Sequence, residues 1–130
     1  MSDAMTFELV SPERKLASVE ADAVTLPGMA GDMTAMANHA PFLTTLRPGF
    51  VSVRNGGSED RYFVTGGFAE ISENVVSVLA EEAVEAGSID AAYLDGKISA
   101  VEAELADAGE ERKQAMQLRL NDFIALKSAV

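Results

Sequence analysis

The chain has 130 residues, of which 48% are hydrophobic, enough to form the core of one domain that carries an appendage. Its formal net charge of −11 argues against nucleic-acid binding and against direct binding to anionic membranes, because such polyanions repel an acidic protein. Cysteine is absent and histidine occurs once, at His39, so we expect neither a disulfide framework nor a metal site. No apolar run is long enough for a membrane span, and the first residues lack the features of a targeting segment.

Residues 1–86 have the alternating pattern of short, half-buried strands. Apolar and polar residues alternate in short segments at 7–9, 19–23, 51–53, 62–64 and 76–78. Turn residues lie between these segments, and Asn55-Gly56 supplies the positive φ angles of a tight hairpin. Many short strands with no helix between them predict a flattened antiparallel β-sandwich.

Residues 87–130 change to a helical period. Apolar side chains recur every three or four positions, first at Leu94, Ile98, Val101, Leu105 and Ala108, and then at Met116, Leu120 and Phe123. Ser88 is expected to cap the first helix, and Gly109 to end it in a left-handed turn. We therefore predict two domains: a β-sandwich over 1–86 and an antiparallel α-helical hairpin over 87–130.

The stretch 31–49, GDMTAMANHAPFLTTLRPG, surrounds the single histidine with an acidic turn and two prolines. A catalytic histidine needs a nucleophile or substrate proton within reach, and no serine or cysteine occupies a recognisable nucleophile turn. A hydrolase or isomerase built on His39 and Asp32 is therefore the weakest alternative. Nearby methionines either form a contact face or fill the core. The residue chemistry favours a binding or coupling protein over a free-standing enzyme.

A larger stretch, LPGMAGDMTAMANHAPFLTTLRPG at 26–49, resembles the F-type ATP synthase ε subunits. In that family this region has a turn of glycine and an acidic residue. His-Ala-Pro, two apolar residues and threonine follow, and then Pro-Gly. Two further segments resemble it in the same order, MTFELVSPER at 5–14 and YFVTGGFAEISENVVSVLAEEA at 62–83. With the two terminal helices, the resemblance covers essentially the whole chain, and the lack of transit-peptide features at the first residues favours a bacterial member.

The resemblance implies a non-catalytic subunit of the central stalk, which turns with the c-ring and links proton flow to ATP synthesis. It implies that Gly31, Asp32 and Met33 contact the c-ring. It also implies contact with the γ subunit through His39, Ala40, Pro41 and Phe42. The expected location is the cytoplasmic face of the bacterial inner membrane, reached only through the complex.

The sequence departs from the family pattern at two places. Ala37-Asn38 stands where Pro-Gly commonly precedes the histidine, but asparagine can adopt the left-handed conformation that glycine would, so we expect the turn to survive. Ile89 and Asp90 match the start of the ATP motif of some members, whereas Tyr93 replaces the arginine that would bind phosphate. We therefore expect no ATP binding and no cofactor.

The last helix carries little net charge. From residue 109 onward, four basic residues (Arg112, Lys113, Arg119 and Lys127) face three acidic ones (Glu110, Glu111 and Asp122), which gives a net charge of +1. Long-range attraction to a catalytic β subunit is then weak, so we expect the hairpin mainly to stabilise the subunit. Restraint of ATP hydrolysis is the weaker interpretation. A soluble nucleotide-sensing or adaptor protein with a mobile hairpin is the alternative function.

Overall fold

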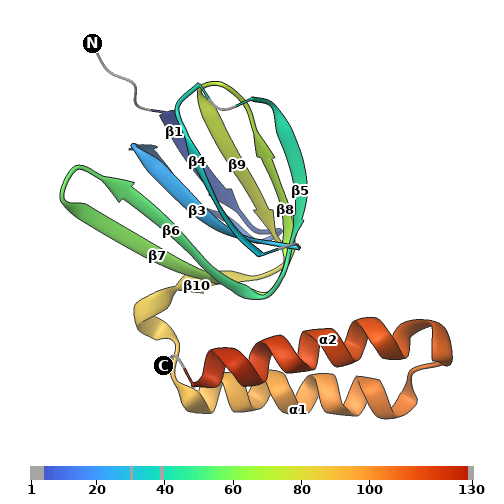
Figure 1. Ribbon diagram of the computed structural model, residues 1–130. Helices are drawn as coiled ribbons and strands as arrows, with labels where there is room; N and C mark the ends of the chain where they lie inside the picture. The colour runs from blue at the N-terminus through green and yellow to red at the C-terminus, as the bar shows by residue number, and fades with distance from the viewer. Residues whose placement is uncertain (1–4, 30, 39, 129–130) are drawn as a thin grey trace. The chain divides into compact units, whose positions relative to one another are not determined.

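The computed structural model describes residues 5–29, 31–38 and 40–128, and the chain divides into two compact units between Ala86 and Gly87. In the first unit the described residues form ten strands: β1 Met5–Val10, β2 Lys15–Ala21, β3 Ala23–Gly28, β4 Gly31–Met36, β5 Phe42–Leu46, β6 Gly49–Asn55, β7 Ser58–Val64, β8 Gly67–Ile71, β9 Val75–Ala80 and β10 Ala83–Glu85. The second unit contains helices α1 Ala91–Asp107 and α2 Glu110–Lys127, after a short 3-10 turn at Ala86–Ser88 (Figure 1).

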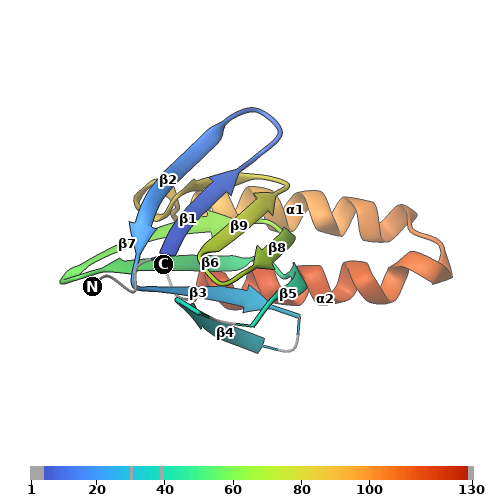
Figure 2. The same ribbon diagram turned by 90° about the horizontal axis from the view of Figure 1, so that it is seen from above.

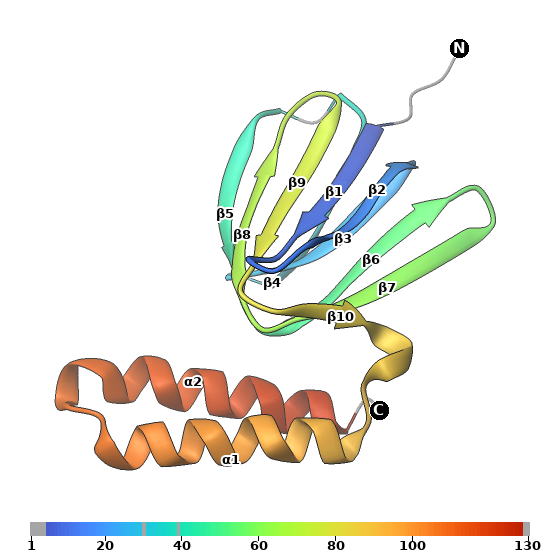
Figure 3. The same ribbon diagram turned by 180° about the vertical axis from the view of Figure 1, so that it is seen from behind.

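The strands form one continuous sheet that folds over on itself as a flattened sandwich, as the sequence predicts. Their hydrogen-bonded order is β10-β7-β6-β3-β5-β8-β9-β1-β2, with β4 paired to β3 outside this path. The sheet is almost wholly antiparallel, and the exception is β1, which runs parallel to β9. Because these two strands lie far apart in the sequence, a long connection is available for a parallel pair. Figure 3 shows β5, β8, β9 and β1 side by side in one layer.

The core lies between the two layers and follows the alternation of the strands. In β1, Met5, Phe7 and Leu9 are almost fully buried, and Val76 and Val78 of β9 lie in the same cluster. Side chains at alternate positions point to opposite faces of a sheet, so the remaining residues of these strands lie on the outer face. The predicted Asn55-Gly56 turn joins β6 to β7, and its positive φ belongs to Gly56, at 63°.

The helical hairpin forms as predicted, but its caps differ from those expected. Asp90, not Ser88, is the N-cap of α1, and its carboxylate accepts a hydrogen bond of 2.8 Å from the Tyr93 amide. Gly109 does not end α1 in a left-handed turn, because its φ is −73° and it serves as the N-cap of α2. Only Ala108 and Gly109 lie between the helices. This link is too short for both a left-handed C-terminal turn and a separate N-cap, so Gly109 serves as the N-cap of α2.

The two helices hold one another through buried apolar groups and ion pairs. Leu94 and Val101 of α1 are buried, as are Leu120 and Phe123 of α2. At one end, the Lys127 ammonium lies 2.7 Å from the Asp95 carboxylate, and at the other Arg112 lies 3.9 Å from Glu104. Neither described helix combines the length and hydrophobicity that a membrane span requires.

Candidate interaction surface

Gly31, Asp32 and Met33 begin strand β4 rather than forming a free turn. They pair with β3 through Gly28↔Gly31, Pro27↔Asp32 and Leu26↔Met33. The alternation of a strand sends neighbouring side chains to opposite faces, so Asp32 is exposed while Met33 packs against the core. Of the expected contact group, Asp32 is thus available to a partner. The Met33 side chain is partly buried against the core, whereas Met29 and Met36 are exposed.

Asn38, which follows β4, has a left-handed backbone conformation. Asn38 has a φ of 67°, the single positive value among the described non-glycine residues, so the expectation of a left-handed asparagine is confirmed. Its amide donates a 2.7 Å hydrogen bond to the Glu73 carbonyl in the β8–β9 turn. Ala40 and Pro41 are exposed, and Phe42 is 48% exposed at the start of β5. His39 lies outside the described residues.

The outer face of the sheet carries an apolar strip that crosses four strands. It consists of Leu43 of β5, Phe68 of β8, Leu79 of β9 and Val10 of β1. The register aligns Phe68 with Leu79 and Leu79 with Val10, and places Leu43 diagonally from Phe68. Leu43, Phe68 and Leu79 are 66%, 54% and 57% exposed. We call these four residues the outer strip; contiguous exposed apolar residues of this kind mark interaction sites.

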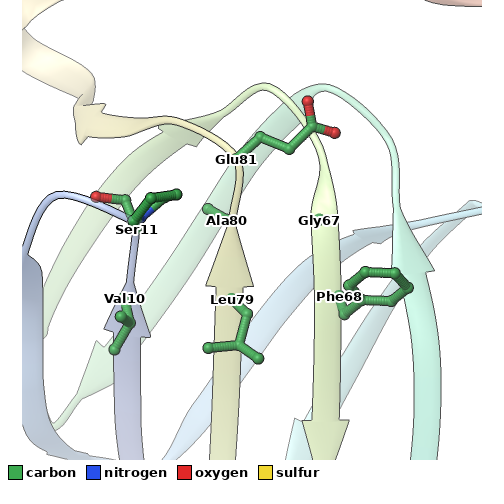
Figure 4. Close-up of a pocket in the computed structure, with 8 residues that line it drawn as sticks. Val10, Ser11, Gly67, Phe68, Leu79, Ala80 and Glu81 are labelled. Atoms are coloured by element: carbon green, nitrogen blue, oxygen red, sulfur yellow. The ribbon is translucent and has the colours of Figure 1, made fainter.

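A groove of about 410 Å³ lies along the outer strip at the ends of β8 and β9. Figure 4 shows the side chains of Val10, Leu79 and Phe68 at one level on neighbouring strands, with Glu81 at the rim. Gly67 lets the two strands approach, because a Cβ there would lie 2.1 Å from the Leu79 carbonyl oxygen. Its φ of 140° is also one that other residues rarely adopt.

The described residues contain no arrangement that suggests catalysis. No group of three or more His, Cys, Asp or Glu side chains among them could hold a metal ion. The phenol pKa of Tyr62 is raised by partial burial and by the nearby carboxylates Asp60 and Glu85. Tyr62 stacks against the core residue Phe7, with ring centroids 6.2 Å apart, so its shift is that of a structural residue.

Replacing Tyr62 with phenylalanine should reduce the loss of stability at alkaline pH. The unfolded phenol loses its proton near pH 10, whereas the folded one keeps it to higher pH, so this stabilisation is complete below pH about 10 and is lost as pH rises through the raised folded pKa. The measurement is urea unfolding of both proteins at pH 8, 10 and 11. Equal losses of unfolding free energy in the two proteins would show that Tyr62 does not contribute.

Comparison with known proteins assigns these features to a family. Residues 4–86 match the family described as "ATP synthase, Delta/Epsilon chain, beta-sandwich domain". The ATP synthase epsilon chain of Rhizobium meliloti is 46% identical over 126 residues, which cover 96% of this chain and 91% of the relative. That of Fuscovulum blasticum is also 46% identical, over 99% of this chain and 98% of the relative.

The chain belongs to the ATP synthase delta/epsilon chain family. One similar solved chain belongs to the Euglena gracilis mitochondrial ATP synthase structure "OSCP/F1/c-ring". The two chains are 26% identical with a TM-score of 0.77, and the match covers 99% of this delta/epsilon-family chain and 82% of the Euglena chain. A chain of the Tetrahymena thermophila "central stalk/cring" structure, 17% identical with a TM-score of 0.54, shares the fold, with 92% of this chain and 96% of the other covered.

In this delta/epsilon-family chain, the segment 89–94, which resembles an ATP motif, forms the start of α1. Ile89 is 8% exposed, and the Asp90 carboxylate caps the helix. The Tyr93 ring lies 5.4 Å from the Lys97 ammonium. Asp90 is thus a structural residue at the helix N-terminus, where its carboxylate binds the Tyr93 amide.

Sequence analysis placed the contact residues of this delta/epsilon-family chain in loops and missed the outer strip. Its signal is the break in alternation: Leu79 and Phe68 are large apolar residues at positions where a half-exposed strand normally carries polar ones. Only the register shows that Leu79 lies between Phe68 and Val10, because β1 is distant in sequence from β8 and β9.

Proposed function

We propose that this chain is the non-catalytic central-stalk (rotor) subunit of a bacterial proton-translocating ATP synthase, and that it couples proton flow to ATP synthesis. The observation that carries the proposal is the match to bacterial epsilon chains over nearly the full length of both proteins. The proposed location is the cytoplasmic face of the inner membrane, where other subunits hold the chain.

The proposed partner of the outer strip is the γ subunit. Burying large apolar side chains such as Phe68 and Leu79 is worth about 1.5–3 kcal/mol each, so a strip of this kind suits a lasting contact. Pro41 and Phe42, which are exposed before and at the start of β5, are proposed as a second contact with γ.

The proposed partner of Asp32 is the ring of c subunits. Its carboxylate is exposed at the start of β4 and suits a basic group on a polar c-subunit loop. Exposed ion pairs contribute about 0–1 kcal/mol, so Asp32 adds orientation to the contact more than strength.

Purification of the intact synthase from cells that express a tagged copy of this chain tests the proposal. The γ, α, β and c subunits should co-purify in the proportions of a complete synthase, and deletion of the gene should uncouple ATP synthesis from proton flow. Recovery of the tagged chain without these subunits would reject the stalk assignment.

The isolated chain should not bind ATP at physiological concentrations. Tyr93 provides neither a fixed positive charge nor the two-pronged donor set of arginine, and Asp90 is occupied as a helix cap. Isothermal titration calorimetry of the purified chain with Mg-ATP is the measurement. A micromolar dissociation constant would instead favour the alternative function, a nucleotide-sensing protein.

We also propose that the hairpin is at most a weak restraint on ATP hydrolysis. Each basic side chain of α2 interacts within the hairpin: Lys127 with Asp95, Arg112 with Glu104, Lys113 with Glu110, and Arg119 with the Phe123 ring. The two pairs that join α2 to α1, Lys127 with Asp95 and Arg112 with Glu104, together with burial of Leu120 and Phe123, oppose a rearrangement that opens the hairpin toward the catalytic subunits.

Deletion of residues 88–130 should therefore leave ATP hydrolysis by the assembled synthase changed by less than about twofold. The sandwich has its own core and should still fold and assemble. Hydrolysis is measured on membranes that contain equal amounts of wild-type and truncated complex. Activation by several-fold would show that the hairpin is a strong restraint.

A further inference from the structure

The corner between β2 and β3 is joined to the turn between β6 and β7 by three hydrogen bonds, which we call the corner clasp. The Asp22 amide donates to the Arg54 carbonyl over 2.7 Å. The Asn55 side-chain amide donates to the Glu20 carbonyl over 3.1 Å. The Gly56 amide donates to the Asp22 carboxylate over 2.7 Å. Figure 2 shows the β2–β3 corner close to the end of the β6–β7 hairpin, although the two are distant in sequence.

Asn55 and Gly56 carry the chemical groups for deamidation, the loss of an asparagine side-chain nitrogen. Asn55 is the one asparagine of the sequence that precedes a glycine, and both residues are exposed. The amide nitrogen that follows an asparagine can attack its Cγ, and glycine hinders this attack least because it has no side chain. A surface hollow of about 190 Å³ beside Asn55, also lined by Val19 and Ser58, has room for the water that the reaction consumes.

Deamidation of Asn55 takes two balanced steps. In the first, the Gly56 nitrogen loses its proton to solvent and bonds to the Asn55 Cγ, while the Cγ–Nδ2 bond breaks and the Nδ2 group takes a proton from water and leaves as ammonia. In the second, water cleaves the resulting succinimide ring. Cleavage between Cγ and nitrogen gives aspartate, whereas cleavage between the main-chain carbonyl carbon and nitrogen gives isoaspartate, in which the main chain runs through the former side chain.

The folded chain holds Asn55 and Gly56 away from the geometry that ring closure requires. Asn55 pairs with Ser58 at the end of β6, so its main chain is extended. In an extended residue the following nitrogen and the Cβ lie on different sides of the Cα–C bond, whereas the succinimide ring needs them on the same side. The Glu20 carbonyl also fixes the direction of the Asn55 amide group. Attack therefore requires the turn to leave the clasp.

Asp22 protects the pair in two ways. Its carboxylate binds the Gly56 proton that must leave before the nitrogen can attack. The nitrogen anion would form next to this carboxylate, and a negative charge disfavours a second one beside it. The same hydrogen bond keeps the β6–β7 turn on the β2–β3 corner. Loss of the Asp22 carboxylate thus both frees the nitrogen and loosens the turn.

We propose that Asn55 is a deamidation site that the corner clasp keeps inactive until the turn opens. Conversion is irreversible and prevents the complete clasp from forming again. Neither product has the Nδ2 group that donates to the Glu20 carbonyl, and both place a new carboxylate near Asp22. The modification therefore records past opening of this corner. The inference uses the fold alone and does not depend on the proposed function.

Peptide mass spectrometry after incubation at mildly alkaline pH measures conversion of Asn55 in the full chain. Replacement of the amide by a carboxylate raises the peptide mass, and enzymatic methylation of isoaspartate identifies the second product. The folded chain should convert at least about tenfold more slowly than the same chain unfolded in guanidinium chloride. Equal rates in the two states would overturn the proposal, and this comparison requires no variant.

Asp22→Ala removes the protecting carboxylate, and Asp22→Asn is the matched control because its side-chain oxygen can still accept the Gly56 proton. Folded Asp22→Ala should convert Asn55 at least about tenfold faster than wild type, and Asp22→Asn within about threefold. Asn74, which is also exposed but precedes Val75, is the internal reference and should convert equally slowly in all three proteins. Circular dichroism confirms the fold of each variant. An unchanged rate in Asp22→Ala would overturn the proposal, as would a lower rate, which would show that the carboxylate acts as a base.

Discussion

Replacing Gly67 with alanine is expected to lower the stability of the sandwich by roughly 3 kcal/mol or more. The new Cβ would lie 2.1 Å from the Leu79 carbonyl oxygen and 2.9 Å from the Ala80 Cα, and both belong to the neighbouring strand β9. Backbone atoms cannot rotate away as a flexible side chain can, so the β8–β9 pair must separate. The φ of 140° adds strain for any residue with a side chain.

Thermal unfolding of the full chain, followed by circular dichroism, measures this loss. For a domain of this size each kcal/mol corresponds to about 4–8 °C, so the midpoint should fall by more than about 10 °C. Gly57→Ala is the matched control, because its Cβ would meet nothing within 4 Å and its φ is not positive; it should shift the midpoint by no more than about 3 °C. Similar midpoints for Gly67→Ala and wild type would show that β9 can move to accept the methyl group.

Replacing both Phe68 and Leu79 with glutamate is expected to abolish assembly of the chain with the synthase while leaving its fold intact. Both side chains are more than half exposed, so the sandwich loses little core. In the proposed contact with γ, however, two apolar anchors are lost and two carboxylates would be buried without partners. Each anchor of this kind is worth about 2 kcal/mol or more, and about 1.4 kcal/mol corresponds to a tenfold change in affinity, so binding should weaken by at least about 100-fold.

Affinity for synthase depleted of this chain and restored ATP synthesis are the two measurements. Leu118→Glu on α2 is the control, since Leu118 is 56% exposed, close to Leu79 at 57%, and lies outside the outer strip. It should bind within about threefold of wild type. If the double variant bound and coupled like wild type, the outer strip would not be the contact with γ.

Local periodicity was enough to predict the fold class. Alternation in 1–86 and the three-to-four spacing after residue 87 are properties of neighbouring residues, and burial of one face follows from them directly. The left-handed Asn38 could also be expected, because asparagine tolerates that conformation without help from distant residues. Caps were harder to predict, because Ser88 and Asp90 are both suitable residues for the start of α1, and Gly109 can either end one helix or begin the next.

Tertiary structure alone decided which residues form surfaces. Met33 and Met36 look alike in the sequence, yet the pairing of β4 with β3 directs Met33 to the core and leaves Met36 exposed. Val10, Phe68 and Leu79 come from strands as many as 69 positions apart, and they form one strip because β9 pairs with both β8 and β1. Strand pairing between distant segments is governed by burial of the whole sheet, and no short stretch of sequence contains that information.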